Sequence, residues 1–246
     1  CRNASIGIFL DMEKMHTLNH EGKYLSERGP LNIRRYPQER PVIVQAGASE
    51  AGRQVAAETA EVIFTYQMDI HSARDFYNDM QSRAQAAGRH HKLKIIPAVF
   101  VVLGETAEEA QAKRAALDNL VDEHSSLAPL SVALGHDISA YDINGPLPEI
   151  PESNASKRGP ERIIEMARRD NLSILSLARR ICGYQGLEMV GTATMVADTM
   201  QLWLEQGAAN GFNVMFSHFP GGVSEFVTQV VPELQHRGLL REHYSS

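Results

Sequence analysis

The sequence has few cysteines and no long apolar run, and each absence excludes a class of protein. Its 246 residues include two cysteines, Cys1 and Cys182. Two cysteines are too few for a disulfide framework and lack the spacing of a metal site, which suits a reducing, cytoplasmic environment. No apolar run approaches the roughly 18 residues of a membrane span, and no signal-peptide pattern opens the chain. The first residue is cysteine rather than methionine, which indicates a processed or partial chain.

Basic residues are outnumbered by acidic ones, which argues against a nucleic-acid partner. The chain has 24 Lys and Arg against 30 Asp and Glu, a net charge of −6, and no basic patch is interleaved with aromatic residues. A Gly-x-Ser-x-Gly motif is missing and neither cysteine has a neighbouring histidine, so acyl transfer has no support. His16 and His20 have helical spacing but lack the glutamate of a metal-binding helix, so we expect no bound metal.

The most informative segment that is present runs from Pro41 to Thr65 and reads as strand, glycine turn, helix and second strand. Residues 42–44 are apolar at every position, which predicts a parallel strand buried on both faces. Gly47 allows a sharp turn, and Ser49 is suited to cap the following helix. Unpaired N–H groups at such a helix start can bind a phosphate, here at Ala48 and Ser49. Local sequence alone favours the simpler alternative of a serine-capped turn without a ligand.

The glycine spacing in this turn invites comparison with a nucleotide-binding P-loop. Gly47 and Gly52 are separated by four residues, but Arg53 and Gln54 stand where that loop needs lysine and then serine or threonine. The lysine that reaches the terminal phosphates and the hydroxyl that holds Mg²⁺ are both missing. The sequence therefore excludes a nucleoside triphosphatase at this turn.

Strand and helix patterns alternate along the chain, which predicts α/β architecture with parallel strands. Strands are expected at 41–46, 61–66, 94–103 and 212–217. Helices are expected at 49–59, 71–87, 106–124, 160–168, 172–181, 193–208 and 223–236. Ahead of these, residues 1–40 read as a loop-rich lead-in with a short hairpin formed by Tyr24-Leu25 and Leu31 to Ile33.

The number of strands is low for the length of the chain. A (β/α)8 TIM barrel takes about 250 residues, yet four strands are found here, and residues 104–211 separate the last two. We therefore predict the C-terminal half of a TIM barrel, about four βα units, with a long insertion before the last strand. The chain would form a single partial barrel domain, 1–246, in which the segment 125–160, rich in Pro, Gly and Asn from Gly135 onward, is a lid-like insertion.

The Gln-Ala-Gly-x-Ser-x-x-Gly pattern at 45–52 resembles the bacterial-luciferase-like flavin monooxygenases. The resemblance is to the branch that contains nitrilotriacetate monooxygenase, dibenzothiophene-sulfone monooxygenase and the pristinamycin synthases. Gly29-Pro-Leu-Asn32, Leu134 to Tyr141 with Gly145-Pro-Leu-Pro148, and the segment 211–234 fit the same branch in order and spacing. The resemblance covers nearly all of this chain and only the C-terminal part of the family's polypeptide. It implies a barrel whose first four strands precede this segment.

The resemblance also implies roles for individual residues around the glycine turn. Gln45, Gly47, Ala48 and Ser49 would form the loop that binds the FMN phosphate, with Ser49 matching the family's phosphate-binding serine. Ala48 stands where many members carry a second serine, so one hydroxyl contact would be lost. Phe64 matches the residue that lines the pocket beside the isoalloxazine ring.

Three further residues are candidates for the substrate pocket or for catalysis. Tyr66 shares a strand face with Phe64, although aromatic residues in a strand are core residues by default. Val190 stands in a turn that the family places near the substrate. Thr192 beside it is suited to a plain helix cap. His136, the proposed catalytic residue, could donate to a flavin-peroxide oxygen or relay a proton; the alternative is a surface histidine capped by Asp137.

Together these features predict an FMNH2-dependent two-component monooxygenase. The resemblance implies that a separate NAD(P)H:FMN reductase supplies reduced FMN, that O2 adds at flavin C4a as a peroxide, and that a small organic substrate is oxidised. It also implies a homo-oligomer. The chain alone is expected to be inactive, because the groups on the first four strands are missing. The alternatives are a non-catalytic flavin- or phospholigand-binding remnant, a deazaflavin-dependent oxidoreductase on the same scaffold, and an unrelated phosphosugar barrel enzyme.

Overall fold

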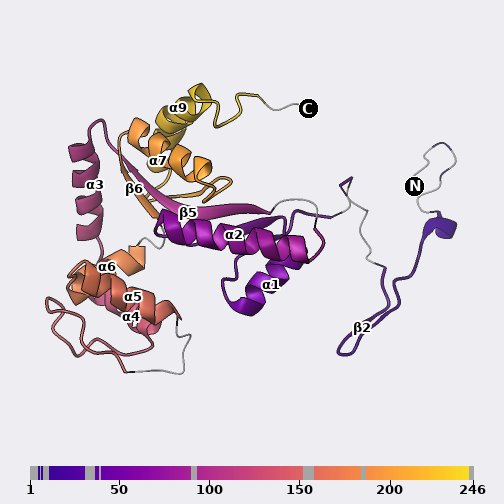
Figure 1. Cartoon of the computed structure of the whole chain (residues 1–246), viewed down its shortest axis with the longest axis horizontal. Coiled ribbons are helices and arrows are strands. Elements are labelled where there is room, and N and C mark those ends of the chain that lie inside the picture. The colour runs from indigo at the N-terminus through magenta and orange to yellow at the C-terminus, as the bar shows by residue number, and fades with distance from the viewer. Residues whose placement is uncertain are drawn as a thin grey trace. The chain divides into compact units, whose positions relative to one another are not determined.

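The structure, a computed structural model, describes residues 5, 7, 11–30, 37–38, 40–89, 93–151, 158–183 and 187–243. The chain divides into two compact units, Cys1–Pro41 and Val42–Ser246. Figure 1 traces the elements of each unit in chain order. Within the described residues, no helix combines the length and apolar character that a membrane crossing requires.

The first unit contains a short antiparallel hairpin. Its strands are β1 (His20–Glu21) and β2 (Ser26–Glu27), and a 3-10 turn, η2 (Met12–Lys14), precedes them. This hairpin differs from the expected one, because Tyr24 and Leu25 lie in its turn rather than in a strand, with 82% and 79% of their surfaces exposed. The expected partner segment, Leu31 to Ile33, lies outside the described residues.

The second unit is built on five parallel strands. They are β3 (Val44–Gln45), β4 (Val62–Thr65), β5 (Lys94–Leu103), β6 (Leu187–Gly191) and β7 (Asn213–Phe216). β3 pairs with β4, and β5 pairs with β4, β6 and β7. The four expected strands are confirmed, while β6 was not expected because its five residues, Leu-Glu-Met-Val-Gly, mix polar and apolar side chains.

Backbone hydrogen bonds show how β5 pairs with three neighbouring strands. The N–H group of Lys94, the first residue of β5, donates to the residue before β4, and that of Gly104, the residue after β5, donates to the last residue of β6. The carbonyl of Ile95 accepts from the N–H of Asn210, which precedes β7. Because successive residues of a strand bond in opposite directions, β4 and β6 follow one another along one edge of β5, and β7 occupies the other.

The expectation that residues 42–44 are buried on both faces is wrong. Val42 and Val44 expose 59% and 57% of their surfaces, and Ile43 exposes 39%. Only Val44 and Gln45 form a strand, and β3 pairs with β4 alone at the end of the sheet. The apolar run therefore belongs to an edge strand, which the local sequence cannot distinguish from a central one.

The helices follow the strands closely, as expected for an α/β protein. Their bounds are α1 (Glu50–Thr59), α2 (Ile70–Ala86), α3 (Ala107–Asn119), α4 (Glu123–Leu134), α5 (Arg158–Arg169), α6 (Ile174–Gly183), α7 (Ala193–Glu205), α8 (Gly221–Glu225) and α9 (Val231–His236), with a π-helical turn, η3 (Phe226–Val230), joining the last two. The expected helix at 106–124 is two helices, because Asp122 accepts a hydrogen bond from the Ser125 N–H and starts α4.

Helices cover both faces of β5. Odd-numbered β5 residues face α1 and α2 at one end and α7 and α9 at the other, with Ile95 and Val99 in the two apolar clusters. Phe100 and Val102, on the opposite face, pack with Leu117 of α3. Because side chains alternate between the two faces of a strand, the ten residues of β5 pack against three separate groups of helices.

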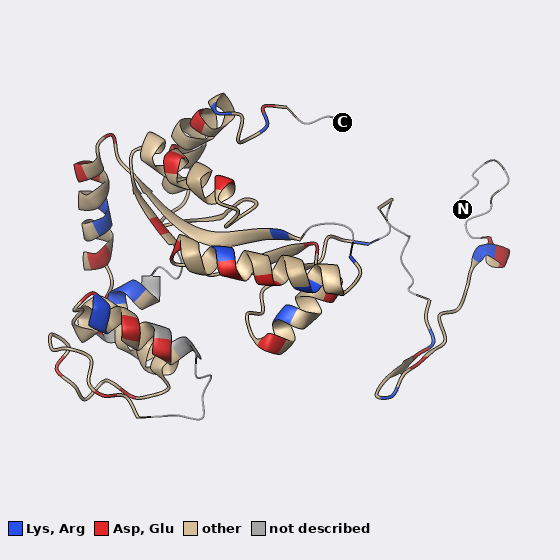
Figure 2. Ribbon diagram, viewed as in Figure 1, with Lys and Arg blue, Asp and Glu red and all other residues tan. Residues whose placement is uncertain are grey.

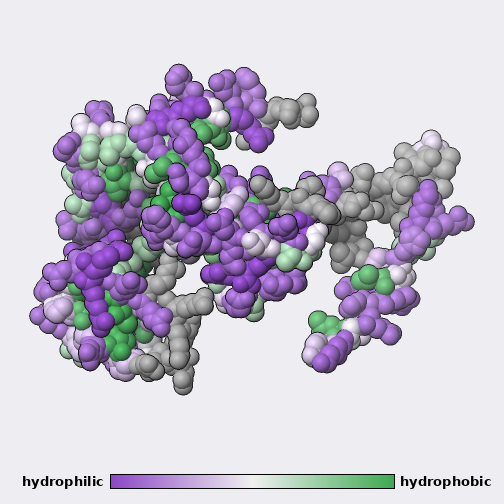
Figure 3. Space-filling view, in the orientation of Figure 1, coloured by the Kyte–Doolittle hydropathy of each residue, from purple (hydrophilic) through white to green (hydrophobic). Residues whose placement is uncertain are grey.

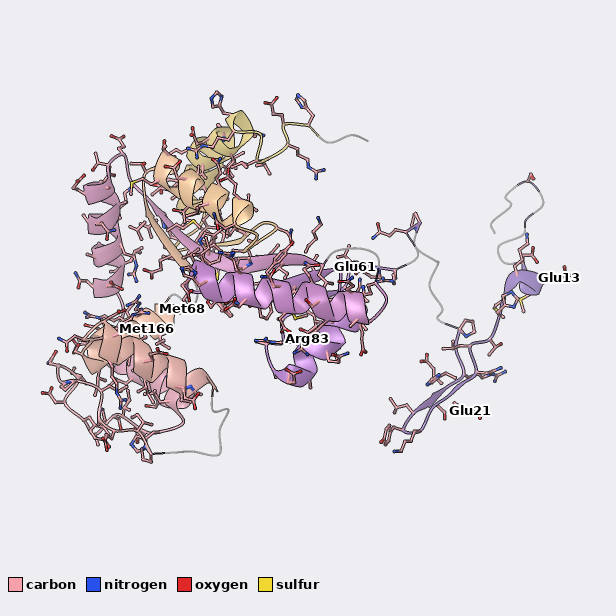
Figure 4. All side chains as sticks on the ribbon, in the orientation of Figure 1. Glu13, Glu21, Glu61, Met68, Arg83 and Met166 are labelled. Atoms are coloured by element: carbon pink, nitrogen blue, oxygen red, sulfur yellow. The ribbon has the colours of Figure 1, made fainter. Side chains whose placement is uncertain are left out.

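The long insertion forms an apolar core of its own from α4, α5 and α6. Leu130, Ile138 and Leu177 are fully buried there, and Figure 3 shows apolar surface over these helices. The segment expected to be lid-like, 125–160, thus contains most of α4, irregular chain over the described residues 135–151, and the first three residues of α5. Met68, two residues beyond Tyr66, packs against this core, which includes Met166 of α5; both residues are labelled in Figure 4.

Candidate functional site

The turn between β3 and α1 has the capped geometry expected from its sequence. Ser49 is extended (φ −67°, ψ 161°), and its hydroxyl accepts a hydrogen bond from the Gly52 N–H at 3.2 Å. The Gln45 side-chain oxygen accepts from the Gly47 N–H, so Gln45 holds the turn from the strand side. Both side chains therefore hold the turn in place from opposite ends.

Two glycines allow this turn to fold tightly. A Cβ on Gly47 would lie 3.3 Å from the Gly52 Cα, and a Cβ on Gly52 would lie 3.2 Å from the Gly47 Cα. Glycine is therefore favoured at both positions because two backbone segments approach closely, and no left-handed backbone angle is involved.

The turn presents backbone donors that suit a phosphate. Gly52 donates to Ser49 and Arg53 donates to the Ser49 carbonyl, whereas no acceptor within the described ranges contacts the N–H groups of Ser49, Glu50 and Ala51. These three groups lie at the positive end of a helix of ten residues. The residues present therefore fit a phosphate group, such as that of FMN.

A chain of ion pairs braces the same turn from α2. Arg53 donates through Nε to the Ala48 carbonyl at 3.1 Å and through Nη1 to Asp79 at 2.8 Å. Arg83 contacts Asp79 at 2.8 Å and Glu50 at 2.7 Å, between α1 and α2 (Figure 4). Figure 2 shows basic and acidic positions along both helices. The Arg83 hydrogen bond lowers the pKa of Glu50. Partial burial alone would raise the pKa of Asp79, but hydrogen bonds from both arginines outweigh it and lower that pKa.

Sequence reasoning missed this network. Asp79 lies 26 residues after Arg53, beyond the reach of any local motif. The available signal was the i,i+4 spacing of Asp79 and Arg83 on one helix face.

Phe64 and Tyr66 lie at the carboxyl end of β4, beside the turn. Their rings meet edge to face, with centroids 5.1 Å apart and planes at 79°. Phe64 is half-buried and Tyr66 is 42% exposed, while Thr65 between them is buried on the other face. The two aromatics therefore share one sheet face, as expected, and that face is partly open to solvent.

Val190 lies on β6, opposite Val102 of β5. It borders a cavity of about 400 Å³ whose wall also includes Met68, Arg114, Arg180 and Glu188. Because Met68 follows β4 and Val190 belongs to β6, this cavity lies between the end of β4 and β6. The sequence analysis identified Val190 but none of the charged residues around it.

Arg114 of α3 is the most buried charge near this cavity, with 8% of its surface exposed. It contacts Asp118 at 2.5 Å and Glu188 at 2.8 Å. Burial would lower the pKa of Arg114, but the bonds to both carboxylates outweigh it and raise that pKa. Arg180, at the same cavity, contacts Asp170 at 2.7 Å. Both arginines are therefore already neutralised by acidic neighbours.

His136 lies directly after Gly135, whose left-handed backbone (φ 66°) ends α4. Its Nε2 is 3.3 Å from the Tyr141 hydroxyl. The hydrogen bond found for the His136 ring is with Tyr141, whereas Asp137 accepts from the Ser139 N–H at 2.9 Å. The bond from Ser139 lowers the pKa of Asp137.

The predicted site residues thus fall into three groups. The glycine turn and the β4 aromatics lie on adjacent strand ends, Val190 borders the cavity, and His136 belongs to the α4–α6 layer. Within the described ranges His136 has no hydrogen bond or ring contact with the other two groups. The residues that the structure describes contain no group of three or more His, Cys, Asp or Glu able to hold a metal ion.

The chain belongs to the luciferase-like monooxygenase family, whose model matches residues 6–210. It is 46% identical over 248 residues to N-acetyl-S-(2-succino)cysteine monooxygenase of Bacillus subtilis (strain 168), covering 99% of this chain and 56% of that protein. It is 44% identical to nitrilotriacetate monooxygenase component A of Aminobacter aminovorans, covering 94% of this chain and 52% of that protein.

The fold is likewise similar to solved structures. DmoA from Hyphomicrobium sulfonivorans matches with a TM-score of 0.87 and 32% identity, over 100% of this chain and 52% of that one. The long-chain alkane monooxygenase LadA matches with a TM-score of 0.80 and 32% identity, over the same shares of the two chains. This chain therefore spans about half the length of the curated relatives and solved structures that it matches.

Proposed function

We propose that the chain provides the FMN-phosphate-binding part of an FMNH2-dependent, two-component monooxygenase. The observation that carries this proposal is the Ser49-capped turn, which presents three backbone donors in a chain of the luciferase-like family. Bound reduced flavin would react with O2 and so supply the oxidising chemistry. The protein would bind and orient the flavin and the substrate, and it would exclude water from the site.

Each predicted site residue has a role in this proposal. Ser49 and the backbone from Gly47 to Glu50 hold the phosphate, and Gln45 shapes the turn by accepting from Gly47. Ala48 contributes backbone only. Phe64 lies beside the flavin ring, Tyr66 and Val190 line the substrate pocket, and His136 holds or moves a proton with Tyr141 as its neighbour.

The scaffold in this proposal is the C-terminal half of a TIM barrel. Each of β3, β4, β5 and β7 is followed by a helix, giving four parallel βα units, with β6 and the α4–α6 layer inserted before β7. The exposed apolar residues Val44 and Tyr66 support a barrel interior that further chain would cover. The segment 125–160 would act as a lid over this end of the barrel.

The remaining parts of the proposal concern partners. A separate NAD(P)H:FMN reductase supplies the reduced flavin, and the name of the nitrilotriacetate relative, which describes it as one component of its enzyme, supports this division of labour. The substrate is a small organic molecule, and the enzyme works in the cytoplasm as a homo-oligomer.

The proposal is tested by flavin binding and oxygen uptake. Fluorescence titration should show that the protein binds FMN more tightly than riboflavin, which lacks the phosphate. Because this chain alone is expected to be inactive, oxygen uptake is measured on a polypeptide in which the barrel is complete. With a flavin reductase, NADH and FMN, a set of sulfides, sulfones and polycarboxylates should include one that increases its oxygen uptake. Equal affinity for both flavins would refute the phosphate site, and FMN binding without substrate-dependent uptake would indicate a non-catalytic flavin-binding protein.

A further inference from the structure

We propose that Arg53 is a positioning residue that sets the direction of the Ser49 N–H toward the flavin phosphate. This inference rests on the proposed function, because it concerns the same phosphate site. It is carried by the hydrogen bond from Arg53 Nε to the Ala48 carbonyl and by the ion pair from Arg53 Nη1 to Asp79.

The planarity of the peptide bond converts a contact on Ala48 into an orientation of Ser49. In a trans peptide the carbonyl of one residue and the N–H of the next point in opposite directions. Arg53 draws the Ala48 oxygen toward its own helix, α1, at 3.1 Å. The Ser49 N–H must then point away from α1, to the side where an anion can meet it together with the N–H groups of Glu50 and Ala51.

The guanidinium is itself held in place from two further sides. Its second contact, with Asp79 of α2, is 2.8 Å long, and its carbon lies 4.9 Å above the Phe76 ring. Phe76 is 6% exposed, and 23% of the Arg53 side chain is exposed. A side chain fixed at three points can fix the peptide that it contacts.

The charges of this ion-pair network cancel. Arg53 is therefore expected to act on the phosphate by positioning the turn rather than by electrostatic attraction. Arg53 and Arg83 are balanced by Asp79 and Glu50 through contacts of 2.7–2.8 Å. The phosphate therefore gains little from net charge at this place, and the benefit must come through the geometry of the turn. Lysine could not substitute, because one ammonium group lacks the planar fork that reaches the carbonyl and the carboxylate at once.

The test compares FMN and riboflavin affinities in three variants of the whole protein. Arg53→Ala removes both contacts, and Arg53→Lys keeps a positive charge opposite Asp79. Arg237→Ala is the matched control, because Arg237 bridges Asp198 of α7 and Glu233 of α9 at 2.6 and 2.8 Å without touching the turn. The readout is the ratio of the riboflavin and FMN dissociation constants, with thermal unfolding as a check on folding.

The wild-type protein should prefer FMN, and both Arg53 variants should lower that preference about tenfold, the factor expected when one charge-assisted hydrogen bond is misaligned. Riboflavin affinity should not change, whereas a general loss of structure would weaken both flavins equally. Arg237→Ala should keep the wild-type preference. If Arg53→Lys keeps it too, or if the Arg53 variants weaken both flavins alike, the inference is overturned while the proposed function stands. If the wild-type protein shows no preference, the proposed phosphate site itself fails.

Discussion

At the scale of single residues, Ser49 combines two tasks that different substitutions separate. Its hydroxyl caps α1, and its N–H and hydroxyl face the proposed phosphate. Ser49→Asp should preserve the cap, because aspartate is among the best N-cap residues and favours a helix start, yet its negative charge should repel the phosphate.

We therefore expect Ser49→Asp to keep the stability of the wild type and to lose its preference for FMN over riboflavin. Ser49→Ala should lose about 1 kcal/mol of stability and only part of the preference, since the backbone donors remain. Urea unfolding and flavin titration measure the two effects. Unchanged FMN binding by Ser49→Asp would contradict the proposed site.

His136 is the residue for which we expect a catalytic effect without a binding effect. In a polypeptide in which the barrel is complete, His136→Gln should lower substrate-dependent oxygen uptake by about 10²-fold or more, the usual contribution of a proton-transferring group, and leave FMN affinity unchanged. The control is Tyr141→Phe, which removes the hydroxyl 3.3 Å from the His136 Nε2 and keeps the ring. A parallel loss of FMN affinity in His136→Gln would instead assign the histidine to cofactor binding.

At the scale of elements, the caps of the helices determine their stability and its dependence on pH. Asp69 caps α2 by accepting from the N–H groups of Ser72 at 2.9 Å and His71 at 3.0 Å. The Ser72 N–H is the main cause of the lowered pKa of Asp69, although partial burial opposes it. A depressed carboxylate pKa stabilises the folded state above the unfolded pKa, 3.8, and the benefit is lost as the pH falls through the lower folded value.

Asp69→Ala should therefore cost about 1 kcal/mol of unfolding free energy at pH 7, and the difference from the wild type should shrink as the pH falls below 4. Asp69→Asn keeps a capping oxygen without titrating, so it should remove this pH dependence and keep most of the stability. Urea unfolding at pH 7, 5 and 3.5 measures both. A constant difference at all pH values would show that the charge of Asp69 does not contribute.

Most element boundaries were predictable because their signals lie within one helical turn of the boundary. Ser49 and Thr192 start helices where the sequence analysis placed them. The break between α3 and α4 was missed, because the capping role of Asp122 competes with a continuous helical pattern. Strand β6 was missed because its pairing with β5 compensates for its mixed composition.

At the scale of the whole molecule, the apolar cores all belong to the second unit. Every described member of the five apolar clusters lies at or after Ala56. Removing residues 1–41 should therefore change the thermal unfolding midpoint of the second unit by less than about 2 °C, which corresponds to under 1 kcal/mol at this size. Differential scanning calorimetry of the full and shortened chains measures it. A large drop would show that the first unit stabilises the second.

The sequence by itself determined the features that depend on neighbouring residues. The serine cap, the close glycine pair, the shared face of Phe64 and Tyr66 and the alternation of strands and helices follow from local steric and hydrogen-bonding rules. The motif at 45–52 also sufficed to indicate the family, which the match over residues 6–210 confirms.

Only the tertiary structure decided which residues far apart in the chain meet. It left Val44 exposed on an edge strand, and it brought Asp79 into an ion pair with Arg53. It also brought Met68 to the cavity that Val190 borders, and it separated His136 from the glycine turn into another layer. The physical reason is that burial and ion pairing depend on the path of the whole chain, whereas a local pattern records only what one turn of helix or one pair of strand residues requires.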